Sequence, residues 1–357
     1  MLLFILLIYH FYLTNPNNKP IFASMIFDAL GFVFCSIIIL VAGTKLSYYG
    51  DLFATVFNLD KGWIGMFMLA FITTLPELTA GISSASFVGS ADLAIANALG
   101  SCACNLAILS IIDFYLPKDR PIFGIATQAH ILSVTLVLIL LNLAGLGIFL
   151  KQDLQILPGI GFISFLFMIM YFFSVRLVYE YNKKIEPKEP DNSLNKPKNY
   201  PTKSKIIIAY VFFATLIVSA AIFLPDFADK IAKKTHLGTT FVGTLFLAVS
   251  TNLPEIAVSF AAVRSGLVDM AIGNLIGSCI YNIFILFIDD IFYLKGSLLF
   301  DASPNHLISI FFCVIMGCII IISLMFQPNK KKYFFGFDTL LIFALYILNL
   351  FLLFKLG

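Results

Sequence analysis

The sequence predicts an all-α polytopic membrane protein of about ten transmembrane helices, built as two five-helix repeats of inverted topology. Composition is the first observation behind this prediction. The 357-residue chain is 60% hydrophobic and only 12% charged, and its mean hydropathy is +0.97. These values lie outside the range of soluble globular domains, so most of the chain is expected to lie in a lipid bilayer.

The second observation is the length of the apolar segments. A helix needs about 20 residues to cross the bilayer, and ten segments reach that length. They are continuously apolar rather than alternating, and only helices or closed barrels satisfy their own backbone hydrogen bonds in lipid. The ten expected helices cover residues 24–48, 62–87, 91–114, 125–149, 157–181, 205–225, 239–264, 267–289, 304–325 and 336–355.

The basic residues predict the orientation of the chain. If the first expected helix begins outside, sixteen of the 23 Lys and Arg residues lie inside, as the positive-inside rule requires. The polar, proline-rich segment 182–204 is then cytosolic, and its composition is typical of a flexible linker. We therefore divide the chain into an apolar N-terminal extension (1–23), a first repeat (24–181), the linker (182–204) and a second repeat (205–357).

The role of the N-terminal extension stays open at this stage. Its first thirteen residues, "MLLFILLIYHFYL", are apolar but short. They lack the basic region and the cleavage site of a signal peptide. An interfacial helix, an eleventh partial span and a mis-assigned start codon all fit this segment.

The third observation is an internal repeat. "LAFITTLPEL" (69–78) aligns with "LAVSTNLPEI" (247–256). "DLAIANALGSCACNL" (92–106) aligns with "DMAIGNLIGSCIYNI" (269–283), with eight identities in fifteen positions. Five helices separate equivalent positions, so the two copies have opposite orientations in the membrane. Inverted repeats are typical of transporters, whose binding site lies at the repeat interface near the bilayer midplane.

Each copy places a proline and then a glutamate inside an apolar helix. Pro76 and Pro254 each remove a backbone hydrogen bond and clash with the carbonyl four residues earlier, which frees carbonyl groups nearby. A charged side chain at mid-bilayer costs at least ~2.5–3.5 kcal/mol and should face a polar cavity. Glu77 and Glu255 therefore predict an oxygen-lined site, and hard cations such as Ca²⁺ and Na⁺ prefer such ligands.

The second part of each copy completes the predicted centre. Ser101 and Asn105 are four residues apart and share one helix face, and Ser278 and Asn282 have the same spacing. A glycine before each serine allows close approach of a neighbouring helix. The four helices expected around one centre contribute Glu77, Glu255, Asn105 and Asn282.

Other polar groups near the motifs are expected to have structural roles. Asp92 and Asp269 stand at helix starts, which is typical of interfacial or capping groups rather than of ligands. The six cysteines lie in predicted helices, where reduced packing residues are the norm. Ligation of a soft metal by the cysteines beside the second motif is the less favoured alternative.

The two motifs resemble the α-repeats of the cation/calcium antiporter superfamily, specifically those of its sodium/calcium exchanger branch. The resemblance rests on "ITTLPEL…NALGSCACN" and "STNLPEI…GNLIGSCIYN", and the ten-helix layout extends it over most of the chain. It implies a Ca²⁺ position flanked by Na⁺ positions. Glu77 and Glu255 would bind Ca²⁺ and would alternately neutralise Na⁺.

The resemblance also implies further ligands. The backbone carbonyls of Thr73 and Thr251 would face Ca²⁺, and Asn105 and Asn282 would occupy the central position. The Na⁺ positions would be lined by Thr74, Asn252, Ser101 and Ser278, together with the carbonyls of Ala70 and Ala248.

The sequence departs from the family pattern in its motifs. The usual Gly-Thr-Ser before Leu-Pro-Glu is Ile-Thr-Thr in the first repeat and Ser-Thr-Asn in the second. Asn252 therefore puts an amide where a hydroxyl lines one Na⁺ position. Asn282 stands where several members carry an acid, which argues against the potassium-dependent branch. The sequence also lacks the Gly-Asn-Ala-Ala-Glu-like motif of proton/calcium exchangers.

Taken with the inverted repeat, the resemblance implies a secondary active transporter, not an enzyme, that exchanges Na⁺ for Ca²⁺ by alternating access. Three alternatives remain: an antiporter of the same fold with H⁺ or another divalent ion, a channel, and an intramembrane hydrolase. The hydrolase would need a nucleophile or metal motif that the sequence does not show. We expect no cofactor beyond the transported ions, no nucleic-acid partner, and a monomer sufficient for transport. The expected location is the cell membrane, which in a bacterium is the inner membrane.

Overall fold

A computed structural model describes residues 19–56, 71, 73–151, 155–157, 160–185, 202–235, 237–331 and 336–356. The first repeat comprises α2 (Lys19–Val56), α4 (Leu75–Ser83) with its π-helical turn η1 (Ser84–Val88), α5 (Ala91–Tyr115), α6 (Ile122–Ile125), α7 (His130–Leu150) and α8 (Phe162–Ile185). A short antiparallel pair, β1 (Gln155–Leu157) and β2 (Ile160–Gly161), precedes α8. The second repeat comprises α9 (Lys203–Thr235), α10 (Thr239–Val242), the π-helical turn η3 (Gly243–Leu247), α11 (Ala248–Thr251), α12 (Leu253–Arg264), α13 (Val268–Phe292), α14 (His306–Phe326) and α15 (Phe337–Leu356).

The helices confirm an all-helical, multi-pass membrane fold. Within the described ranges, eight helices are long and apolar enough to cross a membrane, and the bent pair 239–251 and 253–264 adds a ninth crossing if it is counted as one broken span. Of the predicted helix 62–87, the structure describes residue 71 and residues 73–87. Residues 1–18 of the N-terminal extension and residues 186–201 of the linker lie outside the described residues.

Two predicted helix ends were short. The helix expected to end at residue 48 continues as α2 to Val56. The helix expected to end at residue 225 continues as α9 to Thr235, with Pro225 inside it. A proline inside a membrane helix is tolerated where neighbouring helices compensate for the lost hydrogen bond. Pro225 is buried in the structure, where α9 packs against α2 and α4. Packing against these helices therefore outweighs the local preference of proline to end a helix.

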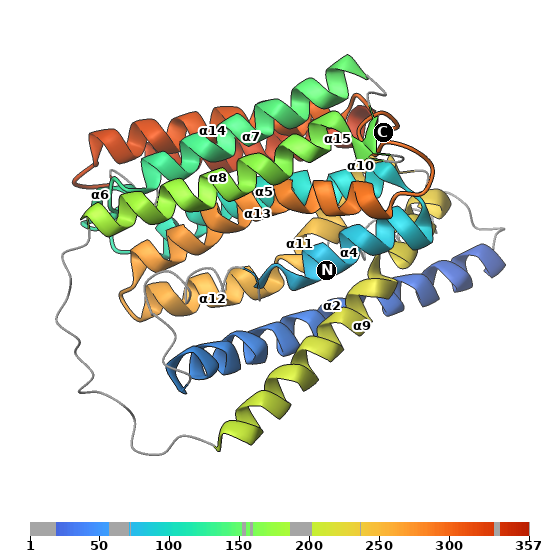
Figure 1. Cartoon of the computed structure of the whole chain (residues 1–357), viewed down its shortest axis with the longest axis horizontal. Helices are drawn as coiled ribbons and strands as arrows, with labels where there is room; N and C mark the ends of the chain where they lie inside the picture. The colour runs from blue at the N-terminus through green and yellow to red at the C-terminus, as the bar shows by residue number, and fades with distance from the viewer. Residues whose placement is uncertain are drawn as a thin grey trace.

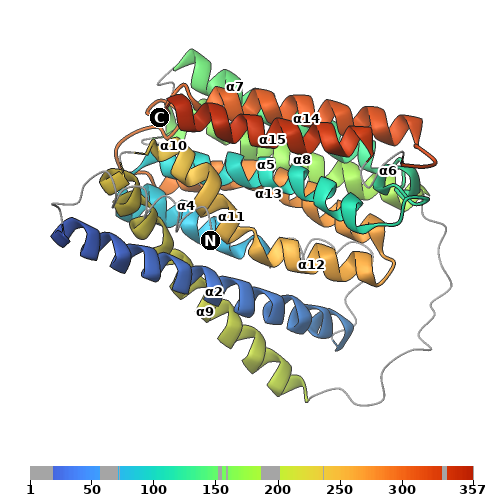
Figure 2. The same cartoon turned by 180° about the vertical axis from the view of Figure 1, so that it is seen from behind.

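The helices form two groups around a central pair. α5 and α13 pack against each other and are the most buried of the candidate spans. In both views α2 and α9 lie along one edge of the molecule, while α7, α8, α14 and α15 lie on the other side of α5 and α13 (Figures 1 and 2). The broken helices, α4 and α10–α12, run between these two groups.

Contacts between the repeats occur in reciprocal pairs. α4 of the first repeat packs on α9, and its counterpart α12 packs on α2. In the same way α13 packs on α7 and α8, while α5 packs on α14 and α15. This reciprocity is expected for two copies of one unit related by an internal two-fold axis.

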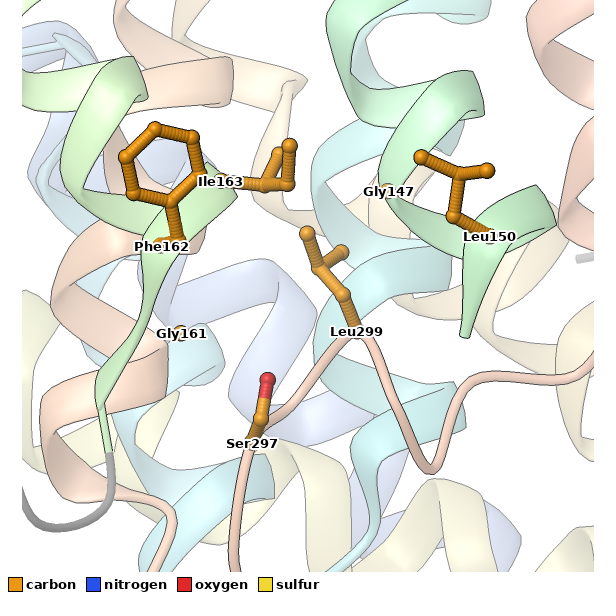
Figure 3. Close-up of a pocket in the computed structure, with 7 residues that line it drawn as sticks. All are labelled: Gly147, Leu150, Gly161, Phe162, Ile163, Ser297 and Leu299. Carbon is orange, nitrogen blue, oxygen red and sulfur yellow. The ribbon is translucent and has the colours of Figure 1, made fainter. Parts of the chain in front are cut away.

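The last turns of α5 and α13 are anchored by equivalent aspartates. On α13, the carboxylate of Asp290 accepts hydrogen bonds from the amides of Gly161 (2.9 Å) and Leu298 (2.5 Å). A small pocket lies beside these loops, lined by Gly147, Leu150, Gly161, Phe162, Ile163, Ser297 and Leu299 (Figure 3). None of these lining residues is titratable, so this pocket is not a candidate ion site.

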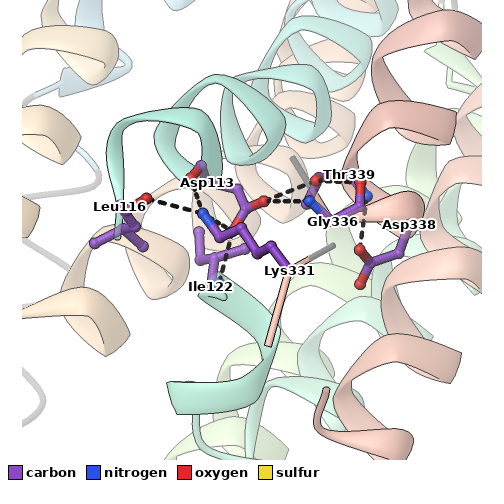
Figure 4. Close-up of polar contacts among 7 residues, drawn as sticks. All are labelled: Asp113, Leu116, Ile122, Lys331, Gly336, Asp338 and Thr339. Carbon is purple, nitrogen blue, oxygen red and sulfur yellow. Dashed lines mark hydrogen bonds and ion pairs between the residues drawn. The ribbon is translucent and has the colours of Figure 1, made fainter. Parts of the chain in front are cut away.

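At the end of α5, Asp113 occupies the position equivalent to Asp290 but has a cationic partner (Figure 4). The Lys331 ammonium lies 3.0 Å from Asp113 Oδ1, and both side chains are fully buried. The same carboxylate accepts hydrogen bonds from the Ile122 amide (2.8 Å), the Gly336 amide (3.0 Å) and the Thr339 hydroxyl (2.8 Å). Asp113 thereby joins α5, α6 and α15 at one end of the bundle.

The starts of α5 and α13 are also anchored by equivalent pairs. Asp92 on α5 accepts from the Ser303 amide (2.7 Å) and contacts His306 Nε2 (2.9 Å) on α14. Asp269 on α13 contacts His130 Nε2 (3.0 Å) on α7 in the same way. Both aspartates therefore anchor the other repeat and are not caps of their own helices.

Candidate functional site

Both repeats interrupt a helix directly before the Leu-Pro-Glu motif. α11 ends at Thr251 and α12 begins at Leu253, and the axes on the two sides of this break differ by 49°. Both α4 and α12 carry proline in the first turn, where its missing amide costs no helical hydrogen bond. Each helix end leaves backbone groups without helical partners, so each break presents polar main-chain groups inside the bundle.

The two predicted carboxylates face one buried centre. Glu77 and Glu255 are 0% exposed, and within the described ranges their four oxygens have no hydrogen-bond partner. They are close enough to interact electrostatically, and each has a threonine of the other repeat as a polar neighbour: Thr251 beside Glu77, and Thr73 beside Glu255. Like charges repel strongly in a low-dielectric interior, so this arrangement needs either a cation between the two groups or bound protons.

Further polar side chains of the predicted site are buried in the same way. Buried polar atoms are normally hydrogen-bonded, so a concentration of unpartnered atoms needs an explanation. Atoms that are buried and lack a partner among the described residues include Ser101 Oγ, Ser278 Oγ, Asn252 Oδ1 and both amide atoms of Asn105 and Asn282. All of them belong to residues predicted from the repeats, and binding of cations would satisfy their oxygens. Their individual roles as ligands stay predictions.

One predicted ligand, the carbonyl of Ala248, already accepts hydrogen bonds within the protein. The carbonyl of Ala248 accepts from the amide of Asn252 (3.0 Å), from its side-chain Nδ2 (2.7 Å) and from the hydroxyl of Thr251 (3.1 Å). In this conformation the Asn252 amide therefore turns its nitrogen to the backbone and leaves its Oδ1 unpartnered. Ala70, the equivalent of Ala248, lies outside the described residues.

The remaining predicted ligands are the first-repeat threonines. Thr73 and Thr74 are buried, and both have polar partners. The hydroxyl of Thr74 donates to the Phe71 carbonyl at 3.5 Å. Both residues thus directly precede α4, which begins at Leu75.

Sequence reasoning missed Asn97 as a site residue. Its Nδ2 donates to the Glu77 carbonyl (3.0 Å), and its Oδ1 accepts from the Thr251 hydroxyl (3.3 Å). Asn97 therefore ties the two helix breaks together at the centre. A signal was present, because Asn97 recurs as Asn274, whose Nδ2 donates to the Ser259 hydroxyl (3.3 Å).

The close approach predicted for the glycine before each serine is present in the first repeat. A methyl group at Gly100 would lie 2.7 Å from the Thr244 Cα and 2.8 Å from the Ala248 Cβ. This contact brings α5 against η3 and α11, beside the site. For Gly277 the equivalent partners, at the 178-residue offset, are residues 66 and 70, which the structure does not describe.

The cysteines behave as packing residues. The thiol of Cys102 donates to the Cys279 carbonyl (3.6 Å), and the thiol of Cys279 donates to the Cys102 carbonyl (3.8 Å). These contacts lie where α5 and α13 pack together, and all six cysteines are free thiols. The two thiols thus have partners within the helix pair and favour the packing interpretation over a soft-metal site.

A bundle of two reciprocal helical repeats around two buried carboxylates defines a secondary cation transporter. The chain belongs to the sodium/calcium exchanger protein family, whose sequence profile matches residues 27–175 and 204–355 and so covers both repeats. It is therefore a cation/calcium antiporter.

Three similar proteins illustrate this relationship. The uncharacterized membrane protein MJ0091 of Methanocaldococcus jannaschii is 29% identical over 264 residues, which cover 72% of this chain and 80% of that protein. The putative antiporter CaxA of Alkalimonas amylolytica is 27% identical over 260 residues, covering 71% and 76% of the two chains. The solved structure of the sodium-calcium exchanger NCX_Mj matches with a TM-score of 0.59 at 21% identity, over 91% of this chain and 98% of that chain. This last likeness concerns the fold alone.

Proposed function

We propose that this antiporter exchanges Na⁺ for Ca²⁺ by alternating access at the centre between Glu77 and Glu255. The observation that carries the proposal is this pair of fully buried carboxylates, which has no cationic partner in the described part of the chain. Two negative charges balance one Ca²⁺, and they also balance Na⁺ ions bound in its place. The same pair can therefore serve both ions in turn, which is the requirement for exchange.

The surrounding oxygen ligands can be assigned to a Ca²⁺ position and to flanking Na⁺ positions. Carboxylate, hydroxyl, amide and carbonyl oxygens suit hard cations, and Ca²⁺ takes about six to eight of them. In this proposal Glu77 and Glu255 hold Ca²⁺ together with the carbonyls of Thr73 and Thr251, and Asn105 and Asn282 lie at the middle. The flanking Na⁺ positions use Ser101, Ser278, Thr74, Asn252 and the carbonyls of Ala70 and Ala248.

The packing of α2 and α9 supports an alternating mechanism. These two long helices pack extensively against each other, and each also lies against the broken helix of the other repeat. The Ser36 hydroxyl on α2 donates to Ser250 (3.0 Å), and the Ser83 hydroxyl donates to the Ile222 carbonyl on α9 (2.5 Å). Movement of the α2–α9 pair would thus be transmitted to the broken helices of both repeats.

The comparisons support the choice of ions and of location. The NCX_Mj structure is that of a sodium-calcium exchanger soaked with Na⁺ and Sr²⁺, and it concerns extracellular ion exchange. We extend Na⁺ coupling to this chain, which has the same fold and belongs to the exchanger family. We also place the chain in the cell membrane, with the linker 182–204 in the cytosol as the basic residues predict.

Coupling to H⁺ is the competing assignment, because buried carboxylates also take up protons. Uptake of ⁴⁵Ca²⁺ into proteoliposomes under an imposed Na⁺, K⁺ or H⁺ gradient distinguishes Na⁺ coupling from H⁺ coupling. We expect uptake with an outward Na⁺ gradient, little with K⁺, and no loss when the pH gradient is collapsed. Asp226→Asn is the matched control, because this exposed acid on α9 pairs only with the neighbouring Lys230 in its described salt bridge. Uptake that follows the H⁺ gradient and ignores Na⁺ would refute the proposal.

A further inference from the structure

A third carboxylate lies buried outside the central site. Asp289 on α13 is 0% exposed, and neither of its oxygens has a hydrogen-bond partner in the described ranges. Its neighbour Asp290 differs, because both oxygens of Asp290 accept backbone amides. An uncompensated buried carboxylate is costly, so a side chain of this kind needs a bound cation or a proton.

The carboxylate of Asp289 lies directly against α4. A methyl group at Gly81 would come within 2.5 Å of both Asp289 oxygens, so only a glycine leaves room for them here. Gly81 follows Glu77 by four residues, which puts it on the same helix face and ~6 Å further along the helix. On α13, Asp289 follows Asn282 by seven residues and shares the face of that residue. Asp289 therefore continues the central site along both helices.

A further oxygen donor shares this face of α4. Ser84 is fully buried and follows Glu77 by seven residues. Its hydroxyl donates to the Ala80 carbonyl (2.7 Å), which leaves the lone pairs of the hydroxyl oxygen available to a cation. At Ser84 the helix changes into the π-helical turn η1, a distortion that is frequent at functional sites.

We propose that Asp289 forms a further Na⁺-binding position, one helical turn from Glu77, on the route between the centre and the membrane face at which α13 ends. Ca²⁺ requires about six to eight oxygens, often from several carboxylates. Asp289 is the one carboxylate with unengaged oxygens at this place in the described structure, so the position suits a monovalent ion.

This carboxylate occurs in the second repeat alone. At the 177-residue offset of the repeat, the counterpart of Asp289 is Ile112, a fully buried apolar residue. The route from the centre to the opposite face thus has no equivalent carboxylate. Sodium ions arriving at the face where α13 ends would bind at Asp289 before they reach Glu77. This inference rests on the Na⁺ coupling proposed above.

Equilibrium binding of ²²Na⁺ to the purified full-length protein tests the inference. Wild type, Asp289→Asn and the control Asp226→Asn are compared at saturating Na⁺ without Ca²⁺. We expect wild type and Asp226→Asn to bind equal numbers of Na⁺, and Asp289→Asn to bind one Na⁺ fewer per chain. Asp289→Ile, which copies the first repeat, is measured in parallel, so the test stands if one of the two variants does not fold.

An unchanged Na⁺ count in folded Asp289 variants would overturn the inference. If these variants also release one proton fewer on Ca²⁺ binding, Asp289 is a proton carrier instead. Failure of the proposed function would be seen in a different experiment, the ⁴⁵Ca²⁺ uptake assay, where wild-type uptake would not depend on the Na⁺ gradient.

Discussion

The two repeats are alike at the centre of the molecule and differ toward its ends. The paired glutamates, Glu77 and Glu255, are both fully buried with unpartnered oxygens, and the paired serines and asparagines behave in the same way. At the ends, Asp113 is paired with Lys331, whereas its equivalent Asp290 binds backbone amides. Duplicated residues at the shared site therefore keep the same environment in both repeats. The duplicated aspartates in the last turns of α5 and α13 meet different loops, and their partners have diverged.

The largest expected effect tests the equivalence of the two glutamates. Glu77→Gln and Glu255→Gln should each reduce Na⁺-driven ⁴⁵Ca²⁺ uptake by at least about 100-fold, because a divalent ion would lose half of its balancing charge in a low-dielectric site. Each variant should still elute as a monodisperse protein, since the amide removes an unpaired buried charge. Ordinary transport by either purified variant would show that the two repeats do not share one site.

The second prediction concerns the two anchoring aspartates. Asp113→Ala leaves the buried Lys331 ammonium without its counter-charge and should lower the free energy of unfolding by about 3–5 kcal/mol. Asp290→Ala removes hydrogen bonds to two amides and should cost about 1–3 kcal/mol. Unfolding of both variants in detergent measures the difference. Equal losses would mean that the ion pair adds nothing to the anchor of the first repeat.

The third prediction compares two equivalent positions, Gly81 on α4 and Ser259 on α12, which both contact α13. Gly81→Ala would push against the Asp289 carboxylate and should cost about 1–3 kcal/mol of stability. Its equivalent Ser259 already carries a side chain, and Ser259→Ala should cost about 0.5–1.5 kcal/mol through the lost bond from Asn274. A Gly81→Ala variant as stable as wild type would contradict the close contact at Asp289.

The smallest expected effect concerns the Asp–His pairs. His306 is fully buried beside Asp92, whereas His130 and Asp269 are 13% and 51% exposed. Asp92→Ala should therefore cost about 1–3 kcal/mol of stability, and Asp269→Ala about 0–1 kcal/mol. Thermal unfolding at pH 6 and pH 8 checks this order. A larger loss for Asp269→Ala would show that exposure does not decide the contribution of these pairs.

The sequence predicted the helices well, and it selected central polar residues that the structure finds buried. Both results have identifiable reasons. Long apolar runs have few ways to satisfy their backbone in lipid, so composition alone predicts helices. The repeat then selected Glu77, Glu255, Asn105 and Asn282, because a duplicated polar group inside a membrane helix is costly unless it has a function.

What the sequence did not predict depends on contacts between distant segments. Asn97 joins Glu77 to Thr251 across the repeats, and nothing in its local sequence indicates this partner. Asp289 stands at the last position of a predicted helix, where a solvent-exposed carboxylate is the ordinary expectation. Its burial against Gly81 follows only from the packing of α13 on α4.

The number of Ca²⁺ ions bound per chain tests the central claim most directly. If both repeats build one site, calorimetric titration of the purified protein without Na⁺ should give one Ca²⁺ per chain. Either glutamate variant should then lose Ca²⁺ binding completely, and addition of Na⁺ to wild type should displace the ion. Two Ca²⁺ per chain, with one retained in Glu77→Gln and the other in Glu255→Gln, would contradict the account, because each repeat would then hold a site of its own.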